Sequence, residues 1–345
     1  MKMKAVLFYE PGIIKYTEVD IPKIRPAEVL VEVHTALTCG TDVKTFRRGH
    51  PMLIKKVPSR FGHEFAGTIV EVGTAANHFQ VGQRVVAANS APCNHCFYCR
   101  IFKHNICENL ELLNGAYAEF IVIPKRIVLH NMIVLPDNVA FEEAAFTEPL
   151  ANVFHGLERS DIDVGKTVGI VGLGPIGLMF VKLAKLRGAK VIAIGRNPLK
   201  LKLAEEFAGA DVTINVTKYK DPEKVIRDLT PERKGLDVTI EAVGLPAIWE
   251  QAISITRKGG TVNLFGGCES GTRIQIDTRR LHYDELKVIS VFHYTPYYFS
   301  KAFNLIASGL IDVKQLITET MPLKDLERAL VKHQNGKVIK IAIKP

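Results

Sequence analysis

The chain has 345 residues, 47% hydrophobic and 23% charged, a composition typical of a folded protein with two sizeable domains. Lys and Arg outnumber Asp and Glu by 45 to 36, giving a net charge of +9. The sequence contains no arginine-rich block and no alternation of basic and aromatic residues, the patterns that would indicate a nucleic-acid surface. The longest apolar run, residues 168–181, is interrupted by glycines and is shorter than the roughly 18 residues that span a membrane. We therefore expect a cytoplasmic protein with neither a nucleic-acid nor a membrane partner.

The apolar pattern changes at about residue 148. Before it, short runs separated by Pro and Gly predict β-strands at residues 5–8, 29–34, 67–72, 84–88 and 118–123. After it, strand and helix patterns alternate at residues 167–171, 176–187, 190–194, 198–207, 212–214, 238–241, 247–255, 261–265 and 287–292. This alternation predicts an α/β fold with a doubly wound parallel sheet. A helix at about 296–308 and an apolar run at 338–343 follow.

A glycine-rich segment joins the first strand and helix of the alternating region. It reads Gly172-Leu173-Gly174-Pro175-Ile176-Gly177. In a strand–turn–helix context, the first glycine permits a tight turn, the second lets a pyrophosphate approach the backbone, and the third allows close helix packing. The N-terminus of the helix favours the phosphate charge. The segment predicts a dinucleotide-binding turn.

The residues after the next strand predict which dinucleotide binds. An acidic residue usually stands about 20 residues beyond the glycines and bonds the ribose 2′-hydroxyl of NAD. Here that place holds Gly195, followed by Arg196, with Lys200 one helical turn further on. Glycine leaves room for a 2′-phosphate and a guanidinium can bind it in a fork. The pattern favours NADP, with NAD as the alternative if Arg196 is only a solvated loop residue.

Four cysteines gather in one short segment: Cys93, Cys96, Cys99 and Cys107. Four thiolates at this spacing can surround one Zn²⁺ tetrahedrally and leave no open position, which indicates a structural zinc site. His95 and His104 lie in the same segment, but four cysteines already complete the shell, so we expect both histidines to be exposed.

A second set of candidate ligands is dispersed along the chain. It comprises Cys39 in the segment Cys39-Gly-Thr-Asp42, His63 and Glu64, and Glu148 followed by Pro149. A cysteine, a histidine and a carboxylate together suit a zinc site that keeps a position for water or substrate. Spacing alone does not show that these residues converge.

These motifs carry a resemblance to a known family. Cys39-Gly-Thr-Asp42, Gly62-His-Glu-Phe-Ala-Gly67, the four cysteines, Glu148-Pro-Leu-Ala151 and the glycine turn are similar, in order and spacing, to those of zinc-containing medium-chain alcohol dehydrogenases, and especially of the sorbitol and threonine dehydrogenase branch. The resemblance covers essentially the whole chain. It implies a β-rich GroES-like catalytic domain with a four-cysteine zinc lobe at residues 1–148, a Rossmann domain at 149–290, and a return to the catalytic domain at 291–345.

The resemblance also implies roles for single residues. Cys39 and His63 would bind a catalytic zinc, with Glu64 or Glu148 completing the site directly or through water. Asp42 would orient the histidine ligand through its other ring nitrogen, and Thr41 would take the proton of the substrate. Lys340 would reach the cofactor phosphates.

The chain departs from the family at the proton relay. Relatives commonly carry a histidine three residues after the proton-accepting hydroxyl, where this sequence has Lys44. Lys44, His34 and His50 are the candidates for that relay. The segment Phe292-His293-Tyr294 follows the last strand of the cofactor domain, and it would line either the cleft between the domains or a contact between subunits.

The predicted activity is hydride transfer from a polyol or sugar-derived secondary alcohol to NAD(P)⁺, with one catalytic and one structural zinc per chain. A close alternative is threonine 3-dehydrogenase. A zinc-free reductase on the same fold is another alternative, but it would not need Cys39, His63, Glu64 and Glu148, so their presence speaks against it. A nucleotide-sensing binding protein held together by the four-cysteine zinc is a third alternative, but it would not need an open metal site. The resemblance further implies a homodimer or homotetramer.

Overall fold

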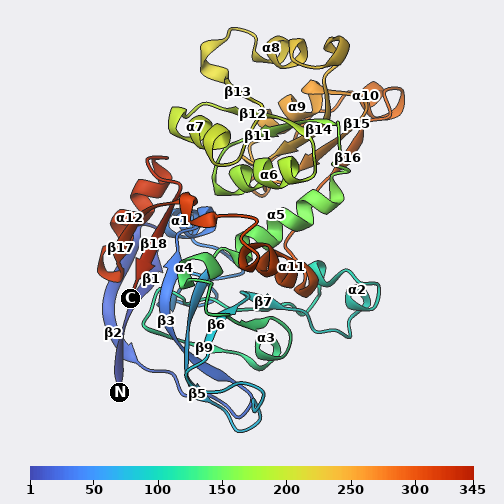
Figure 1. Ribbon diagram of the computed structural model, residues 1–345. Helices are drawn as coiled ribbons and strands as arrows, with labels where there is room; N and C mark the ends of the chain where they lie inside the picture. The colour runs from blue at the N-terminus through green and yellow to red at the C-terminus, as the bar shows by residue number, and fades with distance from the viewer. The chain divides into compact units, whose positions relative to one another are not determined.

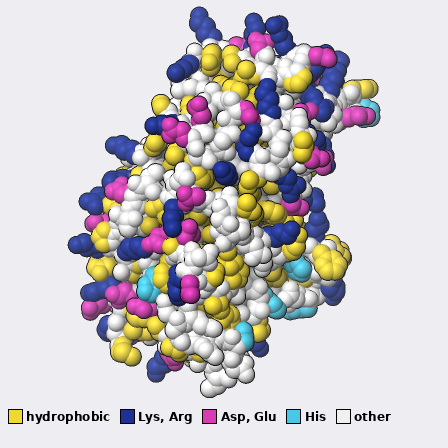
Figure 2. Space-filling view, viewed as in Figure 1, with side chains coloured by type: hydrophobic (Ala, Val, Ile, Leu, Met, Phe, Trp, Pro, Cys, Tyr) yellow, Lys and Arg dark blue, Asp and Glu magenta, His cyan; other side chains and the backbone are white.

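The computed structural model describes all 345 residues, which divide into two compact units. The first unit consists of residues 1–151 and 294–345, and the second of residues 152–293 (Figure 1). Both boundaries fall close to the expected positions at 148 and 290. No helix in the structure is long and apolar enough to cross a membrane. On the face drawn in Figure 2, Lys and Arg side chains are scattered among acidic and apolar ones and form no continuous stripe.

The first unit is built mainly from β-strands around the long strand β3 (Val29–Leu37). Strand β3 pairs antiparallel with three strands that come from distant parts of the chain. The other strands of this sheet are β5 (Phe65–Val72), β6 (Arg84–Ala87), β9 (Phe120–Ile123), β10 (Met132–Val134), β17 (Ile317–Pro322) and β18 (Lys340–Lys344). Because β18 lies directly beside β3, the C-terminal strand is part of the core that begins near the N-terminus.

A smaller sheet and several short helices complete this unit. The sheet contains β1 (Lys2–Glu10), β2 (Ile13–Asp20) and β4 (Ser59–Arg60). The helices are α1 (Gly40–Arg48), α3 (Lys125–His130), α4 (Phe141–Ala144), α11 (Pro296–Ala307) and α12 (Leu326–Gln334), with α5 (Thr147–Arg159) leading into the second unit. The four-cysteine segment forms a lobe with β7 (Ser90–Ala91), β8 (Glu111–Leu112) and α2 (Phe97–Arg100).

Helix α1 was not expected from the sequence, which shows no sustained helical period in the first stretch. Its start is fixed by a capping arrangement: the Cys39 sulfur accepts from the backbone N–H of Thr41 at 3.4 Å, and Asp42 accepts from the backbone N–H of Cys39 at 3.0 Å. These bonds satisfy donors that a helix N-terminus leaves without partners. Cysteine is not among the usual capping residues, so the start of this helix was hard to predict.

The second unit is a six-stranded parallel sheet in the order β13-β12-β11-β14-β15-β16. Its strands are β11 (Thr167–Val171), β12 (Lys190–Gly195), β13 (Val212–Asn215), β14 (Leu236–Glu241), β15 (Thr256–Leu264) and β16 (Lys287–Ile289). The helices are α6 (Pro175–Leu186), α7 (Pro198–Glu206), α8 (Pro222–Asp228), α9 (Pro246–Ile255) and α10 (Thr278–His282). All five residues of β11 are buried, as expected for a strand covered on both faces. The strand order reverses at β11, where doubly wound sheets bind their ligands.

Candidate active site and metal centres

Three potential metal ligands from separate parts of the first unit come together. One donor atom each from Cys39, His63 and Glu64 lies within 4.8 Å of the others. Cys39 caps α1, whereas His63 and Glu64 immediately precede β5. Antiparallel pairing of β3 with β5 brings the two segments together, and the backbone N–H of Leu37 donates to the carbonyl oxygen of Glu64 at 2.8 Å. The structure therefore shows the convergence that spacing alone could not predict.

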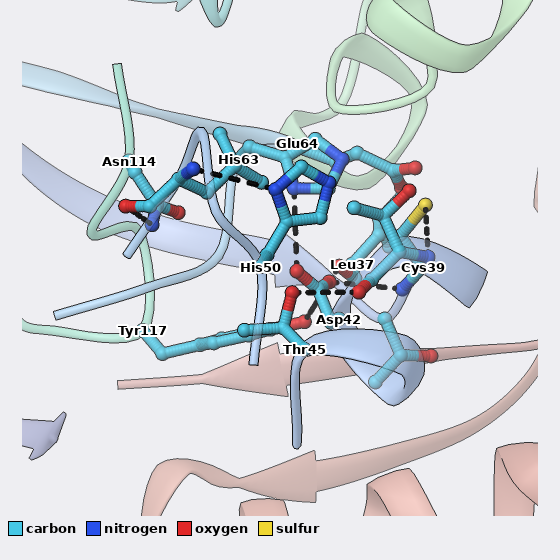
Figure 3. A network of polar contacts seen from close by, with 12 residues as sticks. Leu37, Cys39, Asp42, Thr45, His50, His63, Glu64, Asn114 and Tyr117 are labelled. Atoms are coloured by element: carbon cyan, nitrogen blue, oxygen red, sulfur yellow. Dashed lines mark hydrogen bonds and ion pairs between the residues drawn. The ribbon is translucent and has the colours of Figure 1, made fainter. Parts of the chain in front are cut away.

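Asp42 lies next to His63, and a dashed line joins the two side chains in Figure 3. Its Oδ1 is 3.2 Å from His63 Nδ1, and both side chains are at most 5% exposed. Burial opposes a charge on His63, but the Asp42 carboxylate overrides it and raises the pKa of His63 well above 6.5. Burial likewise opposes ionisation of Asp42, and His63 and Tyr117 lower the Asp42 pKa below its ordinary value. The ion pair places the Asp42 carboxylate at Nδ1, which leaves the other ring nitrogen for a ligand.

Glu64 is held by Lys340 rather than by a residue near it in the sequence. The Lys340 ammonium donates to Glu64 Oε2 and, at 3.0 Å, to the carbonyl oxygen of Thr38. Lys340 is only 2% exposed and its charge is paired inside the first unit, and its contact with the cofactor phosphates stays a prediction. Burial opposes the Lys340 charge, but Glu64 and Cys39 raise the Lys340 pKa above 10.5. The second oxygen of Glu64, Oε1, is buried without a hydrogen-bond donor.

Glu148 stands apart from the three-donor group. It is buried at 6% exposure in the first turn of α5, but it does not belong to the donor atoms that lie within 4.8 Å of one another. The negative charge of Glu148 contributes to raising the pKa of Lys340 and the pKa of Tyr294. Of the two carboxylates proposed for the zinc, Glu64 is thus the one that the structure groups with Cys39 and His63.

The residues expected to handle protons lie on or beside α1. Thr41 is half-buried in the first turn of α1, and Lys44 is exposed one turn later. His50 accepts from the backbone N–H of Leu53 at 3.3 Å. Its pKa is lowered by burial and by the nearby charge of His63.

His34 is different. It lies on β3, stacks on Phe141 with ring centres 4.4 Å apart, and is 3.0 Å from the hydroxyl of Thr68. Through these contacts His34 takes part in the packing of the first unit. Nothing in them joins His34 to His63.

The four cysteine sulfurs form a second group, with all donor atoms within 4.8 Å. Cys93 and Cys99 sulfurs are 3.9 Å apart, and those of Cys96 and Cys107 are 3.8 Å apart. A disulfide would need about 2.05 Å. Four sulfurs placed tetrahedrally at about 2.3 Å from one Zn²⁺ would be about 3.8 Å from each other. The spacing therefore fits a closed zinc site.

The histidines of this lobe lie outside the sulfur group. His95 Nδ1 is 2.8 Å from the carbonyl oxygen of Cys93, and the ring of His104 meets Phe102 edge to face. Backbone N–H groups point at the sulfurs instead: that of Cys96 donates to the sulfur of Cys93 at 3.3 Å. Such bonds favour thiolates, the form that binds metal.

Two of the three glycines in the turn are required by the backbone, and the third borders open space. Gly172 has φ +96°, which side chains rarely adopt. A Cβ on Gly177 would lie 1.8 Å from the carbonyl oxygen of Gly172, so only glycine lets α6 approach the turn. A Cβ on Gly174 would meet nothing within 4 Å, which leaves space above the N-terminus of α6. Pro175 starts the helix, where its missing N–H costs nothing.

The two cations after β12 have no acidic partner. Arg196 is exposed just beyond Gly195, the last residue of β12, and Lys200 is half-buried in the first turn of α7. Neither side chain forms an ion pair. Burial and the neighbouring Arg196 charge lower the pKa of Lys200. Two adjacent cations without a counter-charge form a favourable site for an anion.

The segment expected to line a cleft or a contact has three different environments. Tyr294 is buried in the first unit, where its hydroxyl donates to Asn89 Oδ1 at 2.5 Å. The carbonyl oxygen of His293 lies 2.7 Å from His155 Nδ1, and Phe292 is 55% exposed. Tyr294 is thus anchored by packing and a hydrogen bond.

Tyr117 is a residue that the sequence did not single out. Its hydroxyl donates to Asp42 Oδ2 at 2.6 Å, so it belongs to the network around His63 (Figure 3). The residues next to it in the sequence do not distinguish it from an ordinary core tyrosine, because its partner Asp42 is 75 positions away.

Taken together, an open group of cysteine, histidine and glutamate, a closed four-cysteine group, and a dinucleotide turn at the reversal of a parallel sheet define a zinc-dependent dehydrogenase. Two family models match the chain: the alcohol dehydrogenase GroES-like domain at residues 25–137 and the zinc-binding dehydrogenase at residues 175–308.

Known proteins resemble the chain over 95% or more of its length. Sorbitol dehydrogenase of Bacillus subtilis is 31% identical over 335 residues, covering 95% of this chain and 92% of that protein. Erythritol/L-threitol dehydrogenase of Mycolicibacterium smegmatis is 33% identical over 364 residues, covering 100% and 98%. L-threonine 3-dehydrogenase of Bacillus velezensis is 33% identical over 351 residues, covering 99% of each.

A solved structure of a zinc-binding dehydrogenase from Sinorhizobium meliloti, bound to NADP, superposes with a TM-score of 0.91 at 30% identity and covers 100% of both chains. The chain belongs to the family of zinc-containing medium-chain alcohol dehydrogenases. The resemblance found in the sequence is thereby confirmed.

Proposed function

We propose that the protein oxidises a polyol or a sugar-derived secondary alcohol, with NADP⁺ as the preferred hydride acceptor. The convergence of Cys39, His63 and Glu64 carries this proposal, because an open three-donor site is what separates the alcohol-oxidising enzymes of this fold from zinc-free reductases. Relatives named for sorbitol, erythritol or threitol, and D-arabinitol support a polyol as the substrate.

Cys39 and His63 would hold a catalytic zinc, with Glu64 as the carboxylate, and Glu148 is the alternative carboxylate. A thiolate, an imidazole and a buried carboxylate oxygen without a donor form a donor set that fits Zn²⁺. When bound, the metal would act as a Lewis acid that lowers the pKa of an alcohol, and the nicotinamide would accept the hydride. The four cysteines of the lobe would hold a second, structural zinc.

The side chains around this group divide the remaining work. Asp42 keeps the His63 ring in place through Nδ1. Lys340 neutralises Glu64 within a buried environment. Thr41 is proposed to receive the proton of the substrate. His50, whose pKa responds to His63, and the exposed Lys44 are the two candidates for passing that proton to solvent.

The preference for NADP⁺ rests on Arg196 and Lys200. They present two charges without acidic partners, at the end of the strand where an NAD-specific enzyme would place a carboxylate. The NADP bound to the Sinorhizobium meliloti relative is consistent with this proposal. NAD⁺ is the alternative cofactor.

A second candidate substrate is L-threonine, because L-threonine 3-dehydrogenases are as similar to the chain as the polyol enzymes. Cofactor reduction should therefore be followed with polyols, sugars, simple alcohols and threonine, each with NADP⁺ and NAD⁺ in buffer containing zinc. We expect turnover of a polyol with NADP⁺ preferred. Turnover of threonine alone would replace the substrate, and a clear preference for NAD⁺ would refute the role of Arg196.

The metal assignment has its own test. Cys39→Ser should abolish turnover and lower the zinc content from two to one per chain, while the four-cysteine zinc and the fold remain. Full activity in this variant would overturn the catalytic-zinc assignment. A homodimer or homotetramer and a cytoplasmic location are further proposals, which gel filtration and cell fractionation would test.

A further inference from the structure

Tyr117 lies between the two segments that carry Cys39 and His63. Its side chain is fully buried. Its hydroxyl reaches Asp42, in the first turn of α1, at 2.6 Å. Its ring packs on the backbone of Gly62, the residue before His63: a Cβ on Gly62 would be 2.7 Å from a ring carbon, and Gly62 has φ +92°. One side chain therefore touches both ligand-bearing segments.

The hydroxyl of Tyr117 has two acceptors within reach but only one proton. Asp42 Oδ2 lies at 2.6 Å and the carbonyl oxygen of Leu37 at 3.1 Å. The shorter distance and the negative charge of Asp42 favour the carboxylate, because hydrogen bonds to ionised acceptors are shorter and stronger than neutral ones. Tyr117 thus donates to Asp42.

This bond limits how the Asp42 carboxylate can turn. Oδ2 accepts from Tyr117 and from the backbone N–H of Cys39 at 3.0 Å, which leaves Oδ1 facing His63 Nδ1 (Figure 3). The terminal torsion of an aspartate is soft, with no sharp preference of its own. Without the hydroxyl, Oδ2 would keep a single donor, and the direction of Oδ1 would be less well defined.

We propose that Tyr117 is a positioning residue for the metal site. Its hydroxyl fixes Asp42, Asp42 fixes the His63 ring, and the packing of its ring on Gly62 sets the separation between the two ligand-bearing segments. The inference rests on the proposed metal site of Cys39, His63 and Glu64.

Tyr117→Phe tests the role of the hydroxyl, because it keeps the ring and its contacts with Gly62 and Phe61. The probe is Co²⁺ added to metal-stripped protein, with affinity read from the cobalt absorption bands and from competition with a chelator. Partners that orient a metal ligand are worth about 10- to 100-fold in metal affinity. Since Tyr117 is one bond further out, we expect a loss of roughly tenfold at the three-donor site and none at the four-cysteine site.

Thr239→Val is the matched control. Thr239 also has a buried hydroxyl, which lies 2.6 Å from the hydroxyl of Thr256 in the second unit and has no contact with Asp42. Both variants remove one buried hydroxyl. A role in general stability would lower the unfolding temperature of both, whereas a positioning role would change the Co²⁺ affinity of Tyr117→Phe alone.

A double-mutant cycle with Asp42→Asn shows whether Tyr117 acts through Asp42. If it does, Tyr117→Phe should have little further effect once the carboxylate is gone, so the two losses of affinity will not add. Full additivity would overturn the inference, as would wild-type Co²⁺ affinity in Tyr117→Phe. A wild-type chain that binds only one Co²⁺ would overturn the metal site and this inference with it.

A measurement that leaves Tyr117 in place covers the case in which the phenylalanine variant does not fold. In protein labelled with 3-fluorotyrosine, one buried ¹⁹F resonance should shift both on addition of Zn²⁺ and in Asp42→Asn, while that of Tyr294, which is not bonded to Asp42, should not respond to Asp42→Asn. If no resonance responds to both changes, the inference is wrong.

Discussion

Replacing Lys340 by Met isolates the buried ion pair beside the proposed metal site. Methionine has a similar length and no charge. The change would leave the Glu64 carboxylate, 1% exposed, without the cation that bonds to Oε2, while Oε1 already has no donor. Removing one partner of a buried pair costs about 3–5 kcal/mol, because the remaining charge is buried and uncompensated.

The size of this effect can be translated into a melting temperature. The first unit has about 200 residues, for which each kcal/mol shifts the melting temperature by roughly 2–4 °C. Metal-stripped Lys340→Met should therefore melt roughly 10 °C below the metal-stripped wild type. The control is Lys332→Met, which breaks the half-exposed pair of Lys332 with Glu319 and should cost less than about 1 kcal/mol.

Loading the metal should reduce the difference. A divalent cation held by Cys39, His63 and Glu64 would supply the positive charge that the variant lacks, so Lys340→Met should lose less stability with Co²⁺ than without it. Adding Glu64→Gln to Lys340→Met should also restore stability, because no buried charge remains. The assay is thermal unfolding followed by circular dichroism.

Two results would refute this reasoning. If Lys340→Met cost no more than Lys332→Met, the buried pair would not contribute what its burial implies. If Co²⁺ left the loss unchanged, Glu64 would not face the bound metal, and Glu148 would become the better candidate.

Three further predictions follow from the same geometry. Gly177→Ala should abolish dinucleotide binding in equilibrium dialysis, since its Cβ would lie 1.8 Å from a backbone oxygen of the turn; unchanged binding would contradict the role of the close approach. Arg196→Gln should raise the KM for NADP⁺ about tenfold or more and leave the KM for NAD⁺ unchanged. The control Lys202→Gln removes an equal charge from an exposed ion pair and should change neither KM. An equal effect of Arg196→Gln on both cofactors would exclude recognition of a 2′-phosphate. In metal-stripped protein, the pairing of protonated His63 with Asp42 raises the pKa of His63 and stabilises the fold. This contribution should be complete below pH 6.5 and should disappear as the pH rises through the raised pKa. Denaturant unfolding at several pH values should therefore show a fall in the free energy of unfolding that His63→Gln lacks.

Local patterns predicted the parts of the site whose chemistry lies within one segment. The glycine turn lies within six consecutive residues, and the four cysteines of the lobe lie between residues 93 and 107, so spacing alone indicated a dinucleotide turn and a closed metal site. The structure explains why Gly172 and Gly177 are glycines, whereas a Cβ on Gly174 would meet only open space.

The remaining features depend on contacts between distant residues, which no window along the sequence contains. Lys340 and Glu64 are separated by 276 positions and meet because β18 pairs with β3. The sequence suggested only that Lys340 reaches the cofactor phosphates, and its burial beside a carboxylate follows from the order of the strands. Tyr117 was missed for the same reason, because its hydroxyl donates to Asp42, which lies 75 positions earlier in the sequence.

The placement of β18 also has a consequence for the order in which the molecule is made. Synthesis runs from the N-terminus, so residues 152–293 are complete before β18 leaves the ribosome. The second unit can therefore acquire its sheet while the first unit still lacks β18, and Glu64 has no cation beside it until Lys340 has been synthesised. The group of Cys39, His63, Glu64 and Lys340 is thus completed only after residues 152–293 have been made.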